Sequence, residues 1–216
     1  IAPNKGENMA EQVQITLFTF DELPEESQKN LILGMRERVC EGLGYEPNYD
    51  HVYDNFILEM SERYGACFSQ DDIQWSGFWS QGDGACFTCD FDEEVIFPIL
   101  KERSLMGHQV QWIEELGVEV QSAQSIRCGP SNFYSHENTV TGDLLFNVPG
   151  GKEFDQKIAI LLERALTEII REACTDLYRR LEDEYDHATS DEAIKQRIKE
   201  YWPGCNFRKD GTIFAR

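Results

Sequence analysis

The chain of 216 residues is short of positive charge and has no long apolar segment. It contains 20 Lys and Arg residues against 40 Asp and Glu residues, which gives a formal net charge of −20. A surface of this charge repels nucleic acid and anionic membranes and attracts basic proteins. The sequence has no run of about 18 apolar residues, which excludes a transmembrane helix. No basic segment followed by an apolar one opens the chain, so we expect no signal peptide and a cytoplasmic location.

The sequence also lacks the motifs of common enzyme classes. GxSxG, Walker A, GxGxxG and HExxH patterns are absent, and so is EF-hand spacing. Tyr134 and His136 would share one face of a strand, with Glu137 beside them, and these residue types can serve acid–base chemistry. A polar strand end explains them equally well. Asp50 and Asp54 lie four residues apart on a predicted helix, but no further ligand completes a metal site. We therefore expect no catalytic residue, no cofactor and no metal.

The cysteine pattern does not suggest a disulfide framework. The chain has seven cysteines, an odd number, and they are scattered, which favours a reducing compartment. Cys86 and Cys89 form the only close pair. Residues three apart on a strand point to opposite faces, so these two thiols are not placed to share a metal ion. We expect buried, apolar cysteine side chains there.

Hydrophobic periodicity predicts an α+β fold in which helices cover mainly one face of an antiparallel sheet. The longest predicted helix is amphipathic and spans 154–185, where apolar residues recur every three or four positions. We expect one domain over residues 9–216, and we interpret residues 1–8 as a tag or an upstream extension. The other predicted elements are helices over 21–41, 49–64 and 189–201, mixed helix over 92–117, strands over 12–20, 119–128 and 133–147, and a closing hairpin over 206–215.

The clearest local signal is a β-hairpin over 72–91, with arms at 73–79 and 85–91. The turn between the arms contains two glycines, which suit backbone positions with positive φ. Trp75 and Phe78 are three residues apart, so on a strand they would point to opposite faces. The core face of the second arm is predicted to hold Phe87, Cys89 and Phe91.

This hairpin carries a resemblance. The segment from Ile73 to Phe87 reads IQWSGFWSQGDGACF. It is similar to a hairpin in a family of small bacteriophage and prophage proteins, some of which are labelled "antitoxin of toxin–antitoxin stability system". Weaker similarity occurs at Phe20–Leu23, 132–136 and 210–213. The resemblance implies a viral origin and action in the host-cell cytoplasm. Small acidic phage proteins often bind and block host machinery that handles nucleic acid.

Acidic residues dominate the segment around the hairpin. Between Glu46 and Glu94 the chain holds 12 acidic residues and one base, Arg63. Neighbouring helical turns place side chains about 5–6 Å apart, so a row of carboxylates can imitate phosphates and compete for Lys and Arg clusters. Ordinary solvated faces mix both signs. We therefore predict a partner-binding surface, made of Glu46, Asp50, Asp54, Glu59, Glu62, Asp71, Asp72, Trp79, Gln81 and Asp83.

These observations lead to one favoured hypothesis and two alternatives. The favoured one is a phage-encoded, non-enzymatic factor of the DNA-mimic type, used against host defence or for host takeover, that inhibits a basic, nucleic-acid-handling host protein. The first alternative is an antitoxin that neutralises a cognate toxin through an apolar groove or an edge strand. The second is a small enzyme or ligand-sequestering protein that uses Trp79, Asp83, Tyr134 and His136. No direct nucleic-acid or membrane partner is expected, and a homodimer is compatible with all three.

Overall fold

The computed structural model describes residues 14–40, 47–128, 135–151, 154–204 and 206–214. Its contacts divide the chain into two compact units. The first unit comprises the chain up to Pro47 and from Asp186 onward, and the second comprises Asn48–Tyr185. The expectation of a single domain over residues 9–216 stays a prediction.

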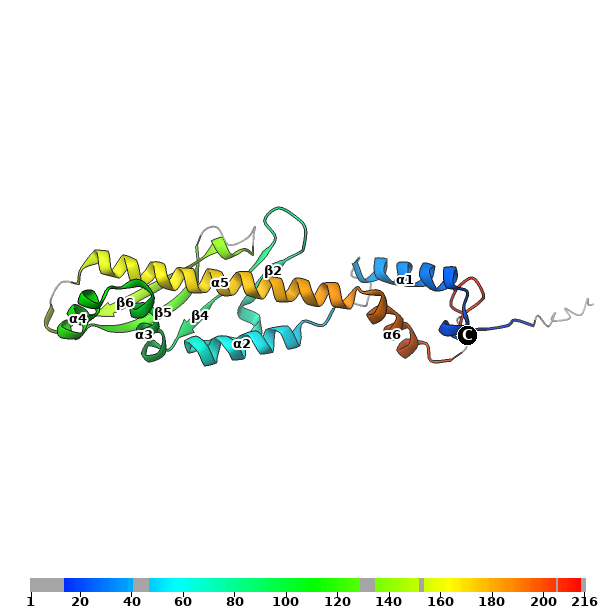
Figure 1. Cartoon of the computed structure of the whole chain (residues 1–216), viewed down its shortest axis with the longest axis horizontal. Helices are drawn as coiled ribbons and strands as arrows, with labels where there is room; N and C mark the ends of the chain where they lie inside the picture. Colours follow the sequence, from blue (N-terminus) through cyan, green and yellow to red (C-terminus); the bar gives the residue numbers. More distant parts are fainter. Residues whose placement is uncertain (1–13, 41–46, 129–134, 152–153, 205, 215–216) are drawn as a thin grey trace, which may run out of the picture. The chain divides into compact units, whose positions relative to one another are not determined.

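The second unit combines helices with antiparallel strands (Figure 1). A four-stranded sheet has the order β1-β4-β5-β6, and β2 pairs with β3 in a separate hairpin. All strand pairs are antiparallel, so the predicted α+β class is confirmed. The helices are α2 (Asp50–Tyr64), α3 (Glu93–Ser104), α4 (Gly107–Leu116) and α5 (Gln156–Ala188), whose last residues belong to the first unit. The strands are β1 (Ala66–Cys67), β2 (Ile73–Ser76), β3 (Gly84–Phe87), β4 (Cys89–Phe91), β5 (Glu119–Arg127) and β6 (Val140–Asn147).

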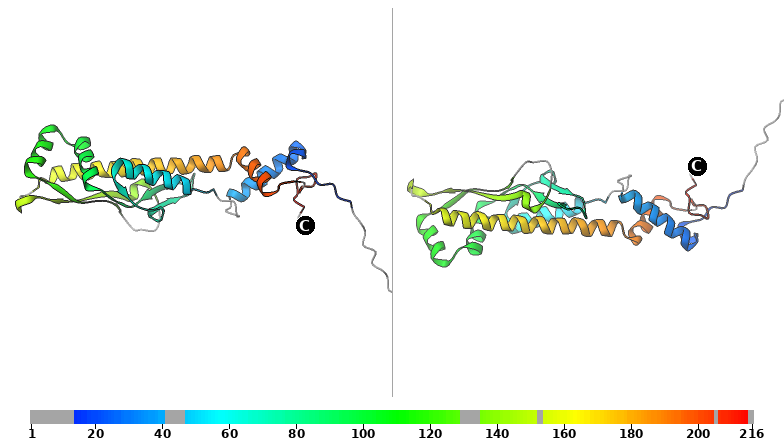
Figure 2. Two further views of the ribbon diagram at one scale, coloured as in Figure 1. Left: turned by 90° about the horizontal axis from the view of Figure 1, so that it is seen from below. Right: turned by 90° about the horizontal axis from the view of Figure 1, so that it is seen from above.

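Helices of the second unit lie mainly on one side of the sheet, as Figure 2 shows. Ala123 on β5 and Leu144 on β6 are buried beneath them. Their neighbours Gln124, Asp143 and Leu145 are at least partly exposed on the other face. Because side chains alternate along a strand, one face of the sheet faces the core and the other faces solvent. None of the described helices, not even the 33-residue α5, is apolar enough to cross a membrane.

The predicted hairpin forms, but its arms are shorter than expected. The first arm ends at Ser76, and the second divides at Thr88 into β3 and β4, which belong to different sheets. The N–H of Thr88 donates to the carbonyl of Asp72 rather than to the four-stranded sheet. The predicted core residues of this arm, Phe87, Cys89 and Phe91, are all buried.

Helix α5 also protects the free edge of the sheet. The backbone N–H of Gly142 on β6 donates to the hydroxyl of Thr167 on α5 at 2.9 Å. A Cβ atom at position 142 would lie 2.6 Å from Cγ of Leu166. Helix α5 therefore packs directly against β6. The Thr167 hydroxyl accepts from a backbone N–H that an edge strand would otherwise expose to solvent.

The first unit contains two helices, α1 (Glu25–Cys40) and α6 (Asp191–Tyr201), and the short 3-10 helix η1 (Phe20–Glu22). Ser190 caps α6 through a hydrogen bond from the N–H of Ala193 at 3.2 Å. The closing segment turns at Gly211, where Phe207 forms a bridge to Ile213. The core of this unit holds Phe20, Leu23, Ile32, Met35, Ile194, Ile198 and Phe207.

The predicted strand over 12–20 is wrong within its described part, residues 14–20. Only Phe18 forms a bridge, to Phe207. The chain then enters η1, because the carboxylate of Glu22 accepts both the N–H and the hydroxyl of Thr19 at 2.9 Å. This local capping box stabilises the 3-10 helix, although the alternation of polar and apolar residues favoured a strand.

The close approach of α5 to β6 generates a stability prediction. Gly142→Ala should lower the free energy of unfolding by about 1–3 kcal/mol, because the added methyl group overlaps Leu166. The matched control is Gly34→Ala on α1, where an added Cβ meets no atom within 4 Å. That substitution should raise the free energy of unfolding by about 0.5–1 kcal/mol, through helix propensity. Urea unfolding measures both, and equal effects of the two variants would contradict the packing argument.

Candidate protein-binding surface

The excess negative charge is concentrated in the second unit. Residues 48–185 hold 26 acidic and 10 basic residues, a net charge of −16. The rest of the chain holds 14 acidic and 10 basic residues, a net charge of −4. A basic partner attracted by the field of this protein would therefore be steered mainly to the second unit.

Helix α2 positions four of the predicted acidic residues, and all four are exposed. Its buried side is formed by Val52, Phe56, Met60 and Tyr64. Asp54 lies toward the segment that follows the helix, because its carboxylate accepts a hydrogen bond from the amide of Gln70 at 2.8 Å. Glu59 lies toward α5, where it accepts from the guanidinium of Arg180 at 2.5 Å. Asp54 and Glu59 are therefore each bound by a neighbouring element, and the partner-binding role of the four acidic residues stays a prediction.

The charge of Glu59 is already paired with Arg180. The same guanidinium also binds Asp176, at 2.6–2.7 Å. These two carboxylates hold the pKa of Arg180 above its ordinary value, although burial acts in the opposite direction. Glu59 is thus part of an ion-pair network that joins α2 to α5, and a partner would have to break that network to use it.

Asp72 and Asp83 have local structural roles. The carboxylate of Asp72 accepts from the N–H and the hydroxyl of Ser69, both at 2.8 Å, and these bonds lower the pKa of Asp72. The carboxylate of Asp83 accepts from the N–H of Ser80 at 2.6 Å and closes the hairpin turn. Both side chains fix loop geometry, as Asp commonly does in turns.

Among the predicted acidic residues that the structure describes, Asp50, Asp54, Glu62 and Asp71 have neither an ion pair nor a role in closing a turn, and we call these four the acidic patch. All four are exposed. Within the described residues none of them forms an ion pair, and Asp54 is bound only by a neutral amide. Glu46, which was predicted with them, lies outside the described residues.

The hairpin tip, residues 77–83, forms a second and separate part of the candidate surface. In the view of Figure 1 this loop and α2 lie on opposite sides of α5. The two parts are connected through the base of the hairpin, where the indole N–H of Trp75 donates to the hydroxyl of Tyr53 at 2.8 Å. Burial, with a smaller contribution from Asp50, raises the pKa of Tyr53. The predicted contact surface is therefore divided into the acidic patch and the hairpin tip.

Aromatic packing shapes the hairpin tip. The ring centroids of Trp75 and Phe78 are only 5.1 Å apart, so the prediction that they point to opposite faces is wrong. The reason is that β2 ends at Ser76 and the strand alternation ends with it. Phe78 is buried against Tyr178 and Tyr185 of α5, at centroid distances of 5.6 and 5.2 Å. Sequence reasoning did not connect these two tyrosines to the hairpin, although their spacing of seven residues places them on one helix face.

Among the described residues, Trp79 is the most exposed large apolar residue, with 72% of its surface accessible. Its φ is 77°, and it is the only non-glycine residue with positive φ among those described. Gln81, which was predicted beside it, is also exposed. The tip therefore presents one large aromatic side chain and one amide to solvent.

Among the residues of the enzyme hypothesis, His136 has a local structural role. Nδ1 of His136 lies 2.8 Å from the carboxylate of Glu137 and accepts from the N–H of Asn138 at 3.2 Å. This imidazole caps the short 3-10 helix η3 (Glu137–Thr139). Tyr134 lies outside the described residues.

Cysteine side chains of the second unit divide into buried and exposed groups. Cys86, Cys89 and Cys174 are buried, whereas Cys67 and Cys128 are exposed. Burial raises the pKa of Cys89 far above its ordinary value and the pKa of Cys174 to about 12. Across the described ranges, no group of three His, Cys, Asp or Glu side chains converges as a metal site would require.

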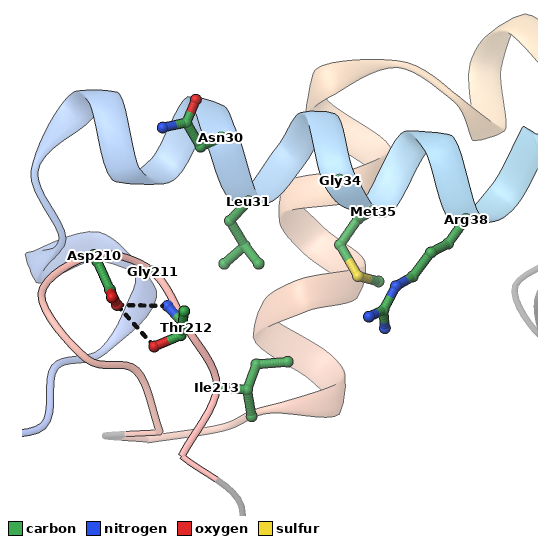
Figure 3. A pocket seen from close by; sticks show the side chains of 9 residues that line it. All are labelled: Asn30, Leu31, Gly34, Met35, Arg38, Asp210, Gly211, Thr212 and Ile213. Atoms are coloured by element: carbon green, nitrogen blue, oxygen red, sulfur yellow. Dashed lines mark hydrogen bonds between the residues drawn. The ribbon is translucent and has the colours of Figure 1, made fainter.

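The first unit has a surface groove of about 460 Å³ between α1 and the closing turn (Figure 3). Leu31, Met35 and Ile213 provide its apolar surface. The carboxylate of Asp210 accepts from the N–H and the hydroxyl of Thr212, at 3.0 and 2.8 Å, and shapes the turn at one end. None of the predicted partner-binding residues lines this groove.

Residues 48–191 match the model of a protein family described as a domain of unknown function, DUF8835. The chain belongs to this family. The match begins at Asn48, the first residue of the second unit, so the acidic patch and the hairpin tip both lie in the family's part of the chain. No curated protein and no solved structure matches the chain.

Thiol reactivity tests the cysteine assignment. At pH 8, iodoacetamide should alkylate Cys67 and Cys128 of the native protein at least tenfold faster than Cys86, Cys89 and Cys174, because burial keeps the reagent away from the last three thiols. Peptide mass spectrometry after timed quenching measures each site, and urea-unfolded protein serves as the control in which all five should react alike. Rapid alkylation of Cys89 in the native state would contradict the buried assignment.

Proposed function

We propose that this protein is a non-enzymatic, phage-encoded inhibitor that binds a basic, nucleic-acid-handling host protein in the host cytoplasm. The observation that carries the proposal is the unequal distribution of charge, with −16 on the family's unit and −4 on the rest. Such an asymmetry is a feature of electrostatically steered recognition.

The acidic patch is the proposed docking region for the partner. Its members stand on α2 and on the short 3-10 helix η2 (Gln70–Asp72), so rigid elements carry their charges. They are exposed and free of ion pairs within the described residues, so a partner's Lys and Arg side chains can approach without breaking an internal contact. Carboxylates on neighbouring helical turns have a spacing suited to basic clusters that normally hold phosphates. Inhibition then follows from occlusion of the partner's nucleic-acid site.

A second candidate function is an antitoxin that binds its toxin through the uncovered face of the sheet. Leu145 is 54% exposed and Ile126 is 38% exposed, and both lie on that face. The register places Leu145 opposite Ser122 and Ile126 opposite Thr141, so the two apolar residues stand on adjacent strands. An apolar contact of this kind would depend little on salt.

Charge reversal separates the two candidates. Replacing Asp50, Glu62 and Asp71 together by Lys should reduce capture of a basic host protein by at least tenfold at low salt, because the encounter is steered by these charges. The matched control is replacement of Glu26, Glu37 and Glu200 by Lys, which changes net charge equally but lies in the first unit. Both sets are exposed, so circular dichroism should show an unchanged fold.

The assay measures binding and inhibition by the full chain in host lysate at about 50 and about 300 mM salt, a range over which screening shortens markedly. The proposal predicts that wild type and the control capture and inhibit a nucleic-acid-binding protein at low salt only. Equal inhibition by the two charge-reversed proteins would refute it. Salt-independent rescue from a toxic neighbouring gene product would instead support the antitoxin.

A further inference from the structure

We propose that Trp79 is the anchor that receives an arginine side chain of the basic partner, with Asp83 and Glu182 supplying the countercharge. This inference rests on the proposed function and deepens it, because it names the group that the hairpin tip recognises. It concerns the hairpin tip alone and not the acidic patch on α2.

The backbone at Trp79 is in a conformation that a tryptophan does not favour. A φ of 77° lies in the left-handed region, where a side chain with a Cβ atom is strained. Glycine or asparagine would adopt this conformation more easily, and Gly82 with φ of 95° does so in the same loop. The fold gains little in return, because 72% of the Trp79 surface remains exposed. Strain retained at an exposed aromatic residue indicates a role in binding rather than in folding.

The rest of the loop holds Trp79 in position. The hydroxyl of Tyr178 on α5 donates to the carbonyl of Gly77 at 3.2 Å. At the other end, Ser80 and Asp83 close a turn in which the N–H of Asp83 donates to the carbonyl of Ser80 at 3.1 Å. Phe78, next to Trp79, is 8% exposed and fills the core beneath the loop. A ring presented on a preformed loop loses little conformational freedom when a partner binds.

The indole keeps its surface open for a ligand. It contacts Tyr185 at a centroid distance of 5.1 Å with an interplanar angle of 73°, and Phe78 at 5.8 Å with 60°. Both are edge-type contacts, which orient the ring without stacking on it. In the described part of the chain no Lys or Arg lies over this ring, although five other aromatic rings carry such a cation.

Charges around the tip favour a cation. The carboxylate of Asp83 lies 3.3 Å from a Cβ built at Gly77, the residue that Tyr178 binds, and Glu182 stands one helical turn after Tyr178 on α5. Burial raises the pKa of Tyr178, and these two negative charges raise it further. The adjacent bases are already occupied, since Arg179 and Arg180 both bind Asp176 at 2.6–2.8 Å. A guanidinium suits this environment better than an ammonium. It stacks on an indole ring, and it donates two hydrogen bonds at once to a carboxylate.

The test uses the full chain and a defined probe, the peptide acetyl-Gly-Arg-Gly-Arg-Gly-amide. The indole N–H signal of Trp79, assigned through its loss in Trp79→Leu, is followed by NMR during titration. We expect the arginine peptide to shift this signal more than those of the other three tryptophans, with millimolar affinity. Replacing both arginines by citrulline should weaken binding about tenfold, since the cation is lost while shape is kept.

Trp79→Leu should lower the affinity for the arginine peptide by about tenfold, because leucine has no aromatic face for the cation. The matched control is Tyr201→Leu, which removes an aromatic residue that is 61% exposed in the first unit. It should leave the affinity unchanged. No shift at Trp79, equal binding of the citrulline peptide, or unchanged affinity in Trp79→Leu would each overturn the inference.

These outcomes are independent of the charge-reversal test. If the arginine peptide fails while the acidic patch still captures a basic protein, the anchor is refuted and the proposed function stands. If no basic protein is captured but the peptide binds at Trp79, the proposed function is refuted and the hairpin tip remains an arginine site.

Discussion

The packing of one apolar stripe of α5 against the sheet is the interaction on which the second unit depends. Burying each leucine or isoleucine of this stripe contributes about 1.5–3 kcal/mol. The same helix supplies Thr167 to the edge of β6, Arg180 to α2 and Tyr178 to the hairpin tip. One element therefore fixes the sheet edge, the ion-pair network and the loop at once. Its fully buried residues include Leu162, Leu166, Ile169, Ile170, Leu177 and Leu181.

The shortage of bases gives α5 a second role. The second unit has only 10 Lys and Arg residues for 26 acids, and several of these bases stand on α5. Arg179 and Arg180 are held by carboxylates of α5 itself and of α2. Arg180 is thus paired where α5 meets α2, and the carboxylates of the acidic patch stay without an ion pair among the described residues. This distribution relieves repulsion at the helix contact and leaves the field directed outward.

Local patterns in the sequence predicted much of the fold. The predicted helices over 49–64 and 189–201 agree closely with α2 and α6, because helix periodicity and capping are short-range properties. The division of the second hairpin arm at Thr88 was not predictable, since it depends on which sheet each half joins.

The candidate surface was predicted in composition but not in arrangement. The acidic residues and Trp79 were identified from their types and density. The pairing of Glu59 with Arg180 joins residues 121 positions apart, and no local pattern reports such a contact. The hydrogen bond that attaches the hairpin tip to α5 likewise joins Gly77 and Tyr178, which lie 101 positions apart. Tertiary contacts therefore decide which predicted residues remain available to a partner.

The hydrogen bond from Tyr178 to Gly77 attaches the hairpin tip to α5 independently of the side chains of the loop. The tyrosine hydroxyl contacts a backbone carbonyl, so this attachment does not depend on the side chains at positions 79–82. Phe78 points inward and maintains the core whatever its neighbours are. Substitutions at positions 79–82 should therefore leave the helix and the sheet in place. The surface chemistry of this loop can change while the framework beneath it stays the same.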